Sequence, residues 1–233
     1  AELSPSLSKH IDGTGLGSFV FLFVIVWWAW FNGTSYHDLH GQNDIRTRVF
    51  TFLQMISVVA MAVFAHDALG ESSVGFALSY AAFQLILTYM WWRTGVHDEN
   101  HRPLSRPYSA AFLLISLAFI GSVFVPTSIR FIIWGIALLL SLLLPLHNIS
   151  LGKRDPAIQA EIDIVLNVTP SLVERFGLFN IIVLGEIVVS VVAGITGHHD
   201  LSWRMGIVGG LGVLIAIGIW WVYFDSISHR LPR

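Results

Sequence analysis

Cysteine is absent from the 233-residue sequence, and charged residues are scarce, at 12% of the total. Without cysteine the chain can form no disulfide and has no thiolate to act as a nucleophile or metal ligand. The formal net charge is −2, so no basic surface indicates nucleic acid as a partner. No nucleophile elbow and no phosphate-binding Gly-rich loop is recognisable. The sequence therefore gives no positive evidence for an enzyme, and we expect no cofactor.

Hydrophobic residues are abundant, at 55%, and the mean hydropathy is +0.70. This composition predicts an all-α polytopic membrane protein, with residues 1–233 in one integral membrane domain and the lipid bilayer as its surroundings. A spanning helix needs about 20 mainly apolar residues. Seven runs of that length are present: Gly15–Tyr36, Arg46–His66, Ser73–Trp92, Tyr108–Val125, Ile129–His147, Ser171–Ile195 and Trp203–Asp225.

Lysine and arginine are divided unevenly between the two ends of these spans. One side collects ten: Arg46, Arg48, Arg93, Arg102, Arg106, Lys153, Arg154, Arg175, Arg230 and Arg233. The other side collects three: Lys9, Arg130 and Arg204. Because cytoplasmic loops are enriched in basic residues, we expect the Ala1 end outside the cell and the Arg233 end in the cytoplasm.

The longest connection, residues 148–170, also contains a helix signal. Asp155 followed by Pro156 is typical of an N-cap with proline at the first helical position. Apolar residues then recur on one helical face, which predicts a short amphipathic helix on the cytoplasmic surface. Thr169-Pro170 is a second start signal and opens the next spanning helix.

Tryptophan pairs occur near the predicted cytoplasmic ends of three spans, as Trp27-Trp28, Trp91-Trp92 and Trp220-Trp221. Tryptophan favours the membrane interface, so anchoring in lipid is the favoured interpretation and ligand stacking is the alternative. Gly206 and Gly210 form a small-xxx-small pattern in the last span. Packing within the chain is favoured for this pattern, and a homo-oligomer interface is the alternative.

One carboxylate lies deep inside a predicted span. Glu186 is about 15 Å from Phe176, close to the membrane midplane if the hydrocarbon begins near Phe176. Arg175 lies only about 20° from Glu186 around the helix, so the two share a face. An acid at that depth costs about 2.5 to 3.5 kcal/mol and is expected to face the bundle interior or a wet cavity. A buried neutral carboxyl with a structural role is the alternative.

Few other polar side chains lie inside the spans. Gln54, Gln84 and Asn180 are amides at intramembrane positions, and we expect the two glutamines to be hydrogen-bond partners of Glu186 or Asn180. For the two glutamines the simpler interpretation is hydrogen bonding between helices. The candidate binding residues are therefore Glu186, Arg175, Asn180, Gln54 and Gln84.

Histidines and carboxylates cluster at two places predicted to be cytoplasmic. His37-Asp38-Leu39-His40 with Asp44 is one, and His97-Asp98-Glu99 with His101 is the other. Such side chains are suitable zinc or manganese ligands, but the spacing matches no standard site. We expect solvated loop residues here, in His198-His199-Asp200 as well, and no metal.

Two neighbouring segments make the chain recognisable. Residues 174–179, Glu-Arg-Phe-Gly-Leu-Phe, followed by residues 182–186, Ile-Val-Leu-Gly-Glu, resemble the bacterial low temperature requirement protein A family. Three further segments agree with this family: Trp27–Thr34, Phe52–Met55 and Trp220–Asp225. The resemblance covers nearly the whole chain and implies a multi-pass protein of the bacterial cytoplasmic membrane that is linked to growth in the cold.

The resemblance also implies helices that this chain lacks. Family members usually begin with a helix containing Glu-Leu-Phe-Phe-Asp-Leu and continue with further C-terminal helices, so the chain resembles a fragment. The leading hypothesis is permeation or transport of a small solute or ion past Glu186. The alternatives are an intramembrane enzyme acting on a lipid-like substrate and a noncatalytic sensor or scaffold in cold adaptation.

Overall fold

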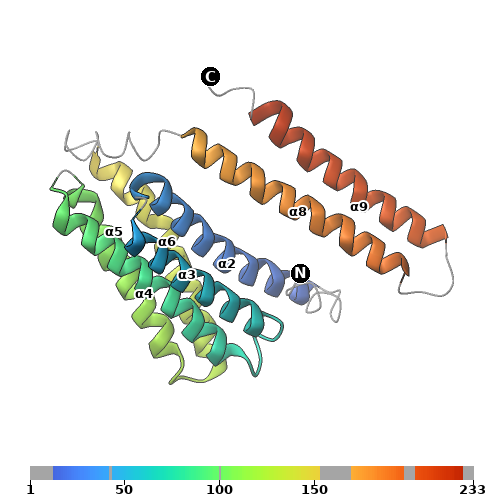
Figure 1. Cartoon of the computed structure of the whole chain (residues 1–233). Helices are drawn as coiled ribbons and strands as arrows, with labels where there is room; N and C mark the ends of the chain where they lie inside the picture. The colour runs from blue at the N-terminus through green and yellow to red at the C-terminus, as the bar shows by residue number, and fades with distance from the viewer. Residues whose placement is uncertain (1–12, 42–43, 100, 153–168, 197–202, 228–233) are drawn as a thin grey trace. The chain divides into compact units, whose positions relative to one another are not determined.

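The computed structural model describes residues 13–41, 44–99, 101–152, 169–196 and 203–227 (Figure 1). They form α2 (Gly13–His40), α3 (Ile45–Ala65), α4 (Ser73–His97), α5 (Arg102–Ser122), α6 (Thr127–Gly152), α8 (Pro170–Thr196), α9 (Trp203–Trp221) and the π-helical turn η1 (Val222–Ile227). Within these residues, seven helices are long and apolar enough to cross a membrane. The all-α polytopic fold is therefore confirmed.

Two helix boundaries show where local signals succeeded and failed. α8 begins at Pro170, as predicted, and the Thr169 hydroxyl caps it by accepting the Leu172 backbone N–H at 3.0 Å. α6 continues to Gly152, so the prediction that the connection starts at residue 148 is wrong by five residues. Pro145 lies inside this helix, where the packing of a spanning segment outweighs the loss of one backbone hydrogen bond. The predicted amphipathic helix after Asp155 lies outside the described residues.

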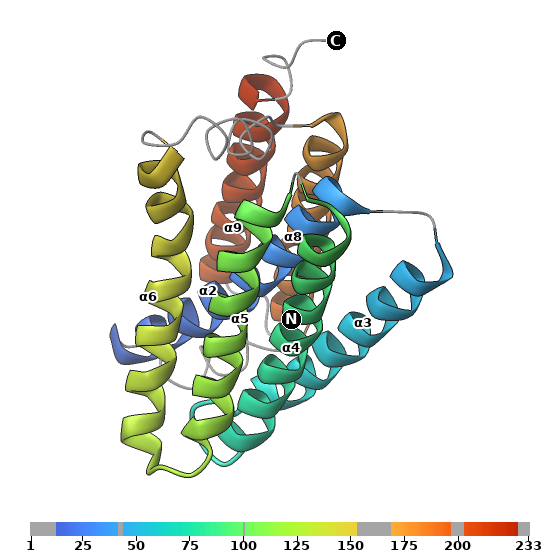
Figure 2. The same cartoon turned by 90° about the vertical axis from the view of Figure 1, so that its left-hand side faces the viewer.

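The chain separates into two compact units, Ala1–Asn167 (unit 1) and Val168–Arg233 (unit 2). In unit 1, α4 is central: it contacts α2, α3 and α5, and α5 contacts α6 (Figure 2). α4 and α5 approach closely at one end, because a Cβ on Gly95 would lie only 2.9 Å from the Ser105 Cβ. More of the buried side chains of unit 1 belong to α4 than to any other helix, so this helix organises its core.

Stacked aromatic rings form one part of this core. The ring centroid of Phe119 lies 4.2 Å from that of Tyr80 and 5.3 Å from that of Trp134, and Phe76 lies 5.4 Å from Trp134. All four side chains are almost completely buried. Such pairs contribute about 0.5 to 1.5 kcal/mol beyond the area that they bury. The arrangement fixes α4, α5 and α6 against one another.

A buried arginine closes the turn between α5 and α6. Arg130 is 7% exposed, and its guanidinium donates to the backbone oxygens of Ser122 at 3.0 Å, Val123 at 3.2 Å and Val125 at 3.3 Å. It also donates to the Ser73 hydroxyl of α4. The last carbonyls of a helix lack partners within the helix and carry partial negative charge, so a cation there stabilises the helix end. Arg130 thus joins three helices, a role that the sequence analysis did not predict for it.

The tryptophan pairs do not all lie in lipid. Trp28 is 8% exposed and Trp91 is 3% exposed, so both belong to the core of unit 1. Trp92, Trp220 and Trp221 are exposed, as interface anchors would be. Lipid anchoring is therefore wrong for Trp28 and Trp91. Adjacent residues differ by about 100° around a helix, so one member of each of these pairs turns inward.

In unit 2, α8 and α9 pack against each other through small residues other than the predicted pair. Gly209 and Ala216 are buried, and a Cβ on Gly212 would lie 2.9 Å from Val191 of α8. A Cβ on Gly206 or Gly210 would meet no described atom within 4 Å. The expectation that Gly206 and Gly210 pack within the chain is thus wrong for unit 2, because this stripe lies about 100° away from the α8 interface around α9.

Candidate functional site

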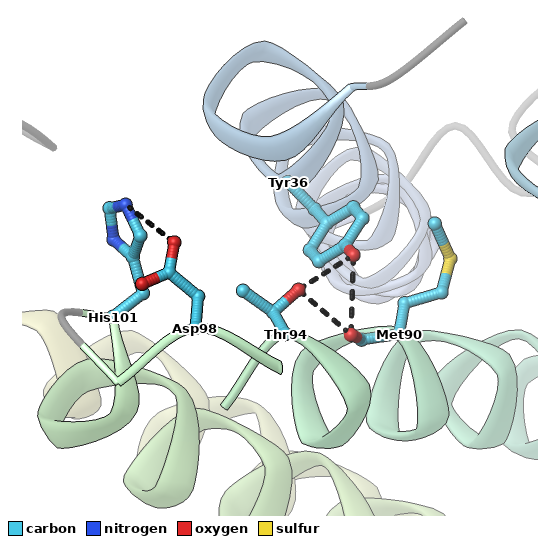
Figure 3. A network of polar contacts seen from close by, with 5 residues as sticks. All are labelled: Tyr36, Met90, Thr94, Asp98 and His101. Atoms are coloured by element: carbon cyan, nitrogen blue, oxygen red, sulfur yellow. Dashed lines mark hydrogen bonds and ion pairs between the residues drawn. The ribbon is translucent and has the colours of Figure 1, made fainter. Parts of the chain in front are cut away.

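One end of unit 1 carries Arg93, Arg102 and Arg106, and we call it the basic end. α2 has 28 residues and α4 has 25, so both are longer than the roughly 20 residues that cross a bilayer. Their last turns meet at this end (Figure 3). The Tyr36 hydroxyl donates to the Met90 carbonyl oxygen at 3.2 Å and lies 3.0 Å from the Thr94 hydroxyl. The ends of these two long helices are therefore joined by polar contacts between Tyr36, Met90 and Thr94.

Histidine and aromatic rings surround this contact. The His40 ring centroid lies 5.2 Å from that of Trp91 and 4.9 Å from that of His101, in both cases nearly perpendicular. The His40 Nε2 and Trp91 Nε1 atoms are buried and have no hydrogen-bond partner. Perpendicular rings allow an N–H group to point at a neighbouring π face, which partly replaces a hydrogen bond. Tyr108 stacks on Trp91 at 4.7 Å and completes the cluster.

One histidine from each of the two sequence clusters, His40 and His101, therefore meets the other in the structure. His37 and His40 are half-buried residues of α2, so the prediction of solvated loop residues is wrong for them. His101 meets His40 and lies 3.8 Å from an Asp98 carboxylate oxygen. In the ranges that the structure describes, no three His, Asp or Glu side chains are arranged to hold a metal ion. The segment with His198, His199 and Asp200 lies outside those ranges.

Asp44 begins α3 beside this cluster. Its carboxylate accepts the Thr47 backbone N–H at 2.7 Å and is the N-cap of the helix. Hydrogen bonding from Thr47 lowers the pKa of Asp44 below its usual value. The carboxylate thus caps the start of helix α3 and remains ionised at neutral pH.

Gln54 forms a hydrogen bond between helices in the membrane-spanning part of unit 1. Its Oε1 atom lies 3.0 Å from Nε2 of His37 on α2, and the Gln54 side chain is buried. Gly33 lies beside this pair and leaves room for the Phe83 ring, because a Cβ there would lie only 3.1 Å from that ring; its 4.0 Å distance from Gln54 Nε2 would be ordinary contact. That Nε2 atom is buried and has no hydrogen-bond partner. Gln54 therefore has spare donor capacity inside the bundle.

Gln84 is 0% exposed and donates from Nε2 to the Tyr80 hydroxyl at 2.8 Å, within α4 itself. Its Oε1 atom is buried without a partner. Contacts of Phe50 with Tyr89 and of Phe64 with Gly75 set the antiparallel register of α3 and α4. This register places Gln54 level with Leu85, one residue from Gln84. The structure thus brings the two predicted amides to one depth, although each bonds to a different neighbour.

The remaining three candidates lie on α8 in unit 2. The Tyr223 hydroxyl donates to the Val173 carbonyl oxygen at 2.6 Å, and Gly177 and Val191 also pack toward α9 and η1. These contacts define the face of α8 that α9 covers. Because each residue advances about 100° around a helix, Glu186 and Arg175 lie on the opposite face, about 160° to 180° away. Both side chains are half-buried.

Asn180 does not share that face. It lies about 120° from Glu186 around α8, near the edge of the α9 interface, and is also half-buried. The structure therefore brings Glu186 and Arg175 together on one face and separates Asn180 from them. Gln54 and Gln84 belong to unit 1.

The sequence did not indicate that Tyr36, Trp91 and Thr94 belong to one polar cluster. Their helices are longer than a bilayer requires, and a hydropathy window ends where apolar residues become rare. The signal that could have found them is the helical spacing of Met90, Thr94 and His97, which continues the α4 pattern beyond its predicted end at Trp92.

Comparison with known proteins places the chain in a family. The family model described as "Bacterial low temperature requirement A protein (LtrA)" matches residues 1–232. The chain is 26% identical over 242 residues to the uncharacterized protein RA0937 of Rhizobium meliloti (strain 1021), covering 98% of this chain and 55% of that protein. The chain thus spans about half the length of this relative. No solved structure matches. The seven spanning helices and the match over nearly the whole length show that the chain belongs to the bacterial low temperature requirement A protein family.

Proposed function

We propose that this membrane protein allows a small ion or solute to permeate, with Glu186 as its intramembrane binding group. The observation that carries the proposal is the position of Glu186 on the face of α8 opposite α9. A carboxylate in the middle of a spanning helix costs about 2.5 to 3.5 kcal/mol unless it faces protein or water. We therefore assign this face to a polar environment of protein or water rather than to lipid.

Arg175 supports the same assignment. It lies eleven residues before Glu186 on the same face, about 16 Å away along the helix axis. That distance is too long for an ion pair, so the two charges act at different depths. We assign Arg175 to the cytoplasmic mouth and Glu186 to a cation or proton site near the midplane.

The amides and imidazole of the bundle supply further polar groups. Gln54 has a free donor and Gln84 a free acceptor at one depth of unit 1, and His37 bonds to Gln54 at 3.0 Å. Amide groups and neutral imidazole rings can both donate and accept hydrogen bonds. We assign Gln54 and Gln84 to the polar lining within unit 1 and Asn180 to the polar groups of unit 2. Glu186 remains the proposed binding group.

Flux through liposomes tests the proposal. Vesicles containing the protein are expected to dissipate a proton or cation gradient faster than protein-free vesicles of the same lipid, because a polar lining replaces part of the hydration shell of the ion. Reconstitution of an unrelated helical membrane protein at equal density controls for leak at the protein–lipid boundary. Equal leak in all three preparations, over a panel of cations, anions and pH gradients, would exclude ion permeation.

A further inference from the structure

An open groove of about 360 Å³ lies between α4 and α5 on the surface of unit 1. Its lining residues are Leu85, Thr88, Tyr89 and Trp92 of α4 and Ser109, Ala110 and Leu113 of α5. On each helix these residues follow the spacing of one face, so two helical faces form the walls. Leu85, Tyr89, Trp92 and Leu113 are each more than one third exposed. The groove thus presents apolar side chains to its surroundings.

The length and polarity of the groove fit a hydrocarbon chain. The four α4 residues that line it span eight positions, from Leu85 to Trp92, which corresponds to about 10 Å, most of the roughly 15 Å hydrocarbon depth of one leaflet. The two hydroxyls in it are satisfied by their own helix. Thr88 donates to the Gln84 carbonyl oxygen at 2.8 Å, and Ser109 donates to that of Arg106 at 3.0 Å. Neither hydroxyl therefore needs a hydrogen bond from a ligand, and an apolar chain can occupy the groove.

The charge at the mouth of the groove indicates the head group. Arg106 lies one turn before Ser109 and Ala110 on the same face of α5, at the basic end, and is exposed. Side chains on a helix lean toward its N-terminus, so Arg106 extends away from the hydrocarbon toward the head groups. Arg102 is held by Glu99 at 3.2 Å and by the Gly95 carbonyl oxygen at 3.1 Å. Within the described residues Arg106 has no ion pair.

We propose that this groove binds an anionic phospholipid of the leaflet at the basic end, with one acyl chain between α4 and α5 and the phosphate on Arg106. Trp92, which is 55% exposed, contacts the lipid at the level of the glycerol backbone, where tryptophan is favoured. The phosphate receives the bidentate donor pair that arginine offers to such groups. This lipid site is independent of ion permeation.

Native mass spectrometry of the purified protein tests the site. The probes are phosphatidylglycerol and phosphatidylcholine with identical acyl chains, titrated separately. Arg106→Gln removes the charge at the mouth, and Ala110→Phe fills the groove. Arg48→Gln is the matched control for charge, because Arg48 is an exposed basic residue of α3 at the same end. Val59→Phe controls for added bulk on a lipid-exposed surface.

The wild type is expected to bind phosphatidylglycerol more tightly than phosphatidylcholine. Arg106→Gln is expected to lower the affinity for phosphatidylglycerol about fivefold and to leave phosphatidylcholine unchanged, as expected for one basic side chain near an anionic lipid. Ala110→Phe is expected to weaken both lipids, and the two controls neither. Equal affinities in Arg106→Gln and Arg48→Gln would overturn the assignment of the phosphate to Arg106. Equal lipid affinities in Ala110→Phe and Val59→Phe would overturn the proposal that an acyl chain binds in the groove.

Discussion

Replacing Arg130 by methionine is expected to lower the free energy of unfolding by about 3 kcal/mol. The guanidinium donates to three backbone carbonyls at the end of α5 and to the Ser73 hydroxyl, and it is 7% exposed. Methionine fills a similar volume but leaves these acceptors without donors at a buried helix end. Each unsatisfied buried group costs about 1 to 3 kcal/mol before relaxation. The measurement is the unfolding transition of the purified protein in mixed micelles of a mild and a denaturing detergent.

Two further variants separate hydrogen bonding from charge. Arg130→Lys keeps the charge but cannot reach all the acceptors at once, so we expect an intermediate loss of stability. Arg48→Met removes an exposed arginine of α3 and is expected to change stability by less than about 0.5 kcal/mol. A protein in which Arg130→Met is as stable as Arg48→Met would contradict the structural role of this side chain.

The second large effect is expected at Glu186. Glu186→Gln keeps the size of the side chain and removes its ability to carry charge, so ion or proton flux is expected to fall at least about tenfold, a loss of about 1.4 kcal/mol in binding or barrier. Glu186→Asp keeps the carboxylate but withdraws it by one methylene group, and partial flux is expected. Flux is measured in liposomes with equal amounts of incorporated, folded protein.

Glu174 provides the matched control for this experiment. It is an exposed carboxylate near the start of the same helix, outside the midplane region. Glu174→Gln is therefore expected to retain the flux of the wild type. If Glu186→Gln and Glu174→Gln conduct alike, an intramembrane acid is not the binding group, and a structural carboxyl at Glu186 becomes the better account.

The spanning helices could be predicted because lipid leaves few choices. Backbone groups in a bilayer must bond within the segment, so a long apolar run forms a helix whatever its neighbours are. The start of α8 was also predictable, because Thr169 and Pro170 act locally. The last turns of α2 and α4 were not predicted. Polar residues there are stabilised by contacts such as that of Tyr36 with Met90, which join positions far apart in the sequence.

The positions of polar side chains could be predicted where they depend on spacing within one helix. Their partners on other helices could mostly not be predicted. The shared face of Glu186 and Arg175 follows from their spacing, but the face that α9 covers depends on Tyr223 and Gly212. The interhelical bond expected of Gln54 is present, with His37 as its partner. Gln84 bonds within its own helix instead. Arg130 had no recognisable pattern at all, because its acceptors are backbone carbonyls that any sequence would supply.

The rate at which a water-soluble reagent reaches position 186 tests most directly whether the Glu186 face of α8 lies in a polar environment. Because residues 1–233 contain no cysteine, Glu186→Cys and Val188→Cys each introduce a single thiol into this chain. Val188 lies at nearly the same depth but about 160° away around the helix. Thiol reagents need the thiolate, which forms in a wet site and not in hydrocarbon. If Glu186 lies in a wet site, a charged, membrane-impermeant methanethiosulfonate is expected to label Glu186→Cys at least about tenfold faster than Val188→Cys. Equal rates, or a folded Glu186→Cys protein that does not react, would contradict it.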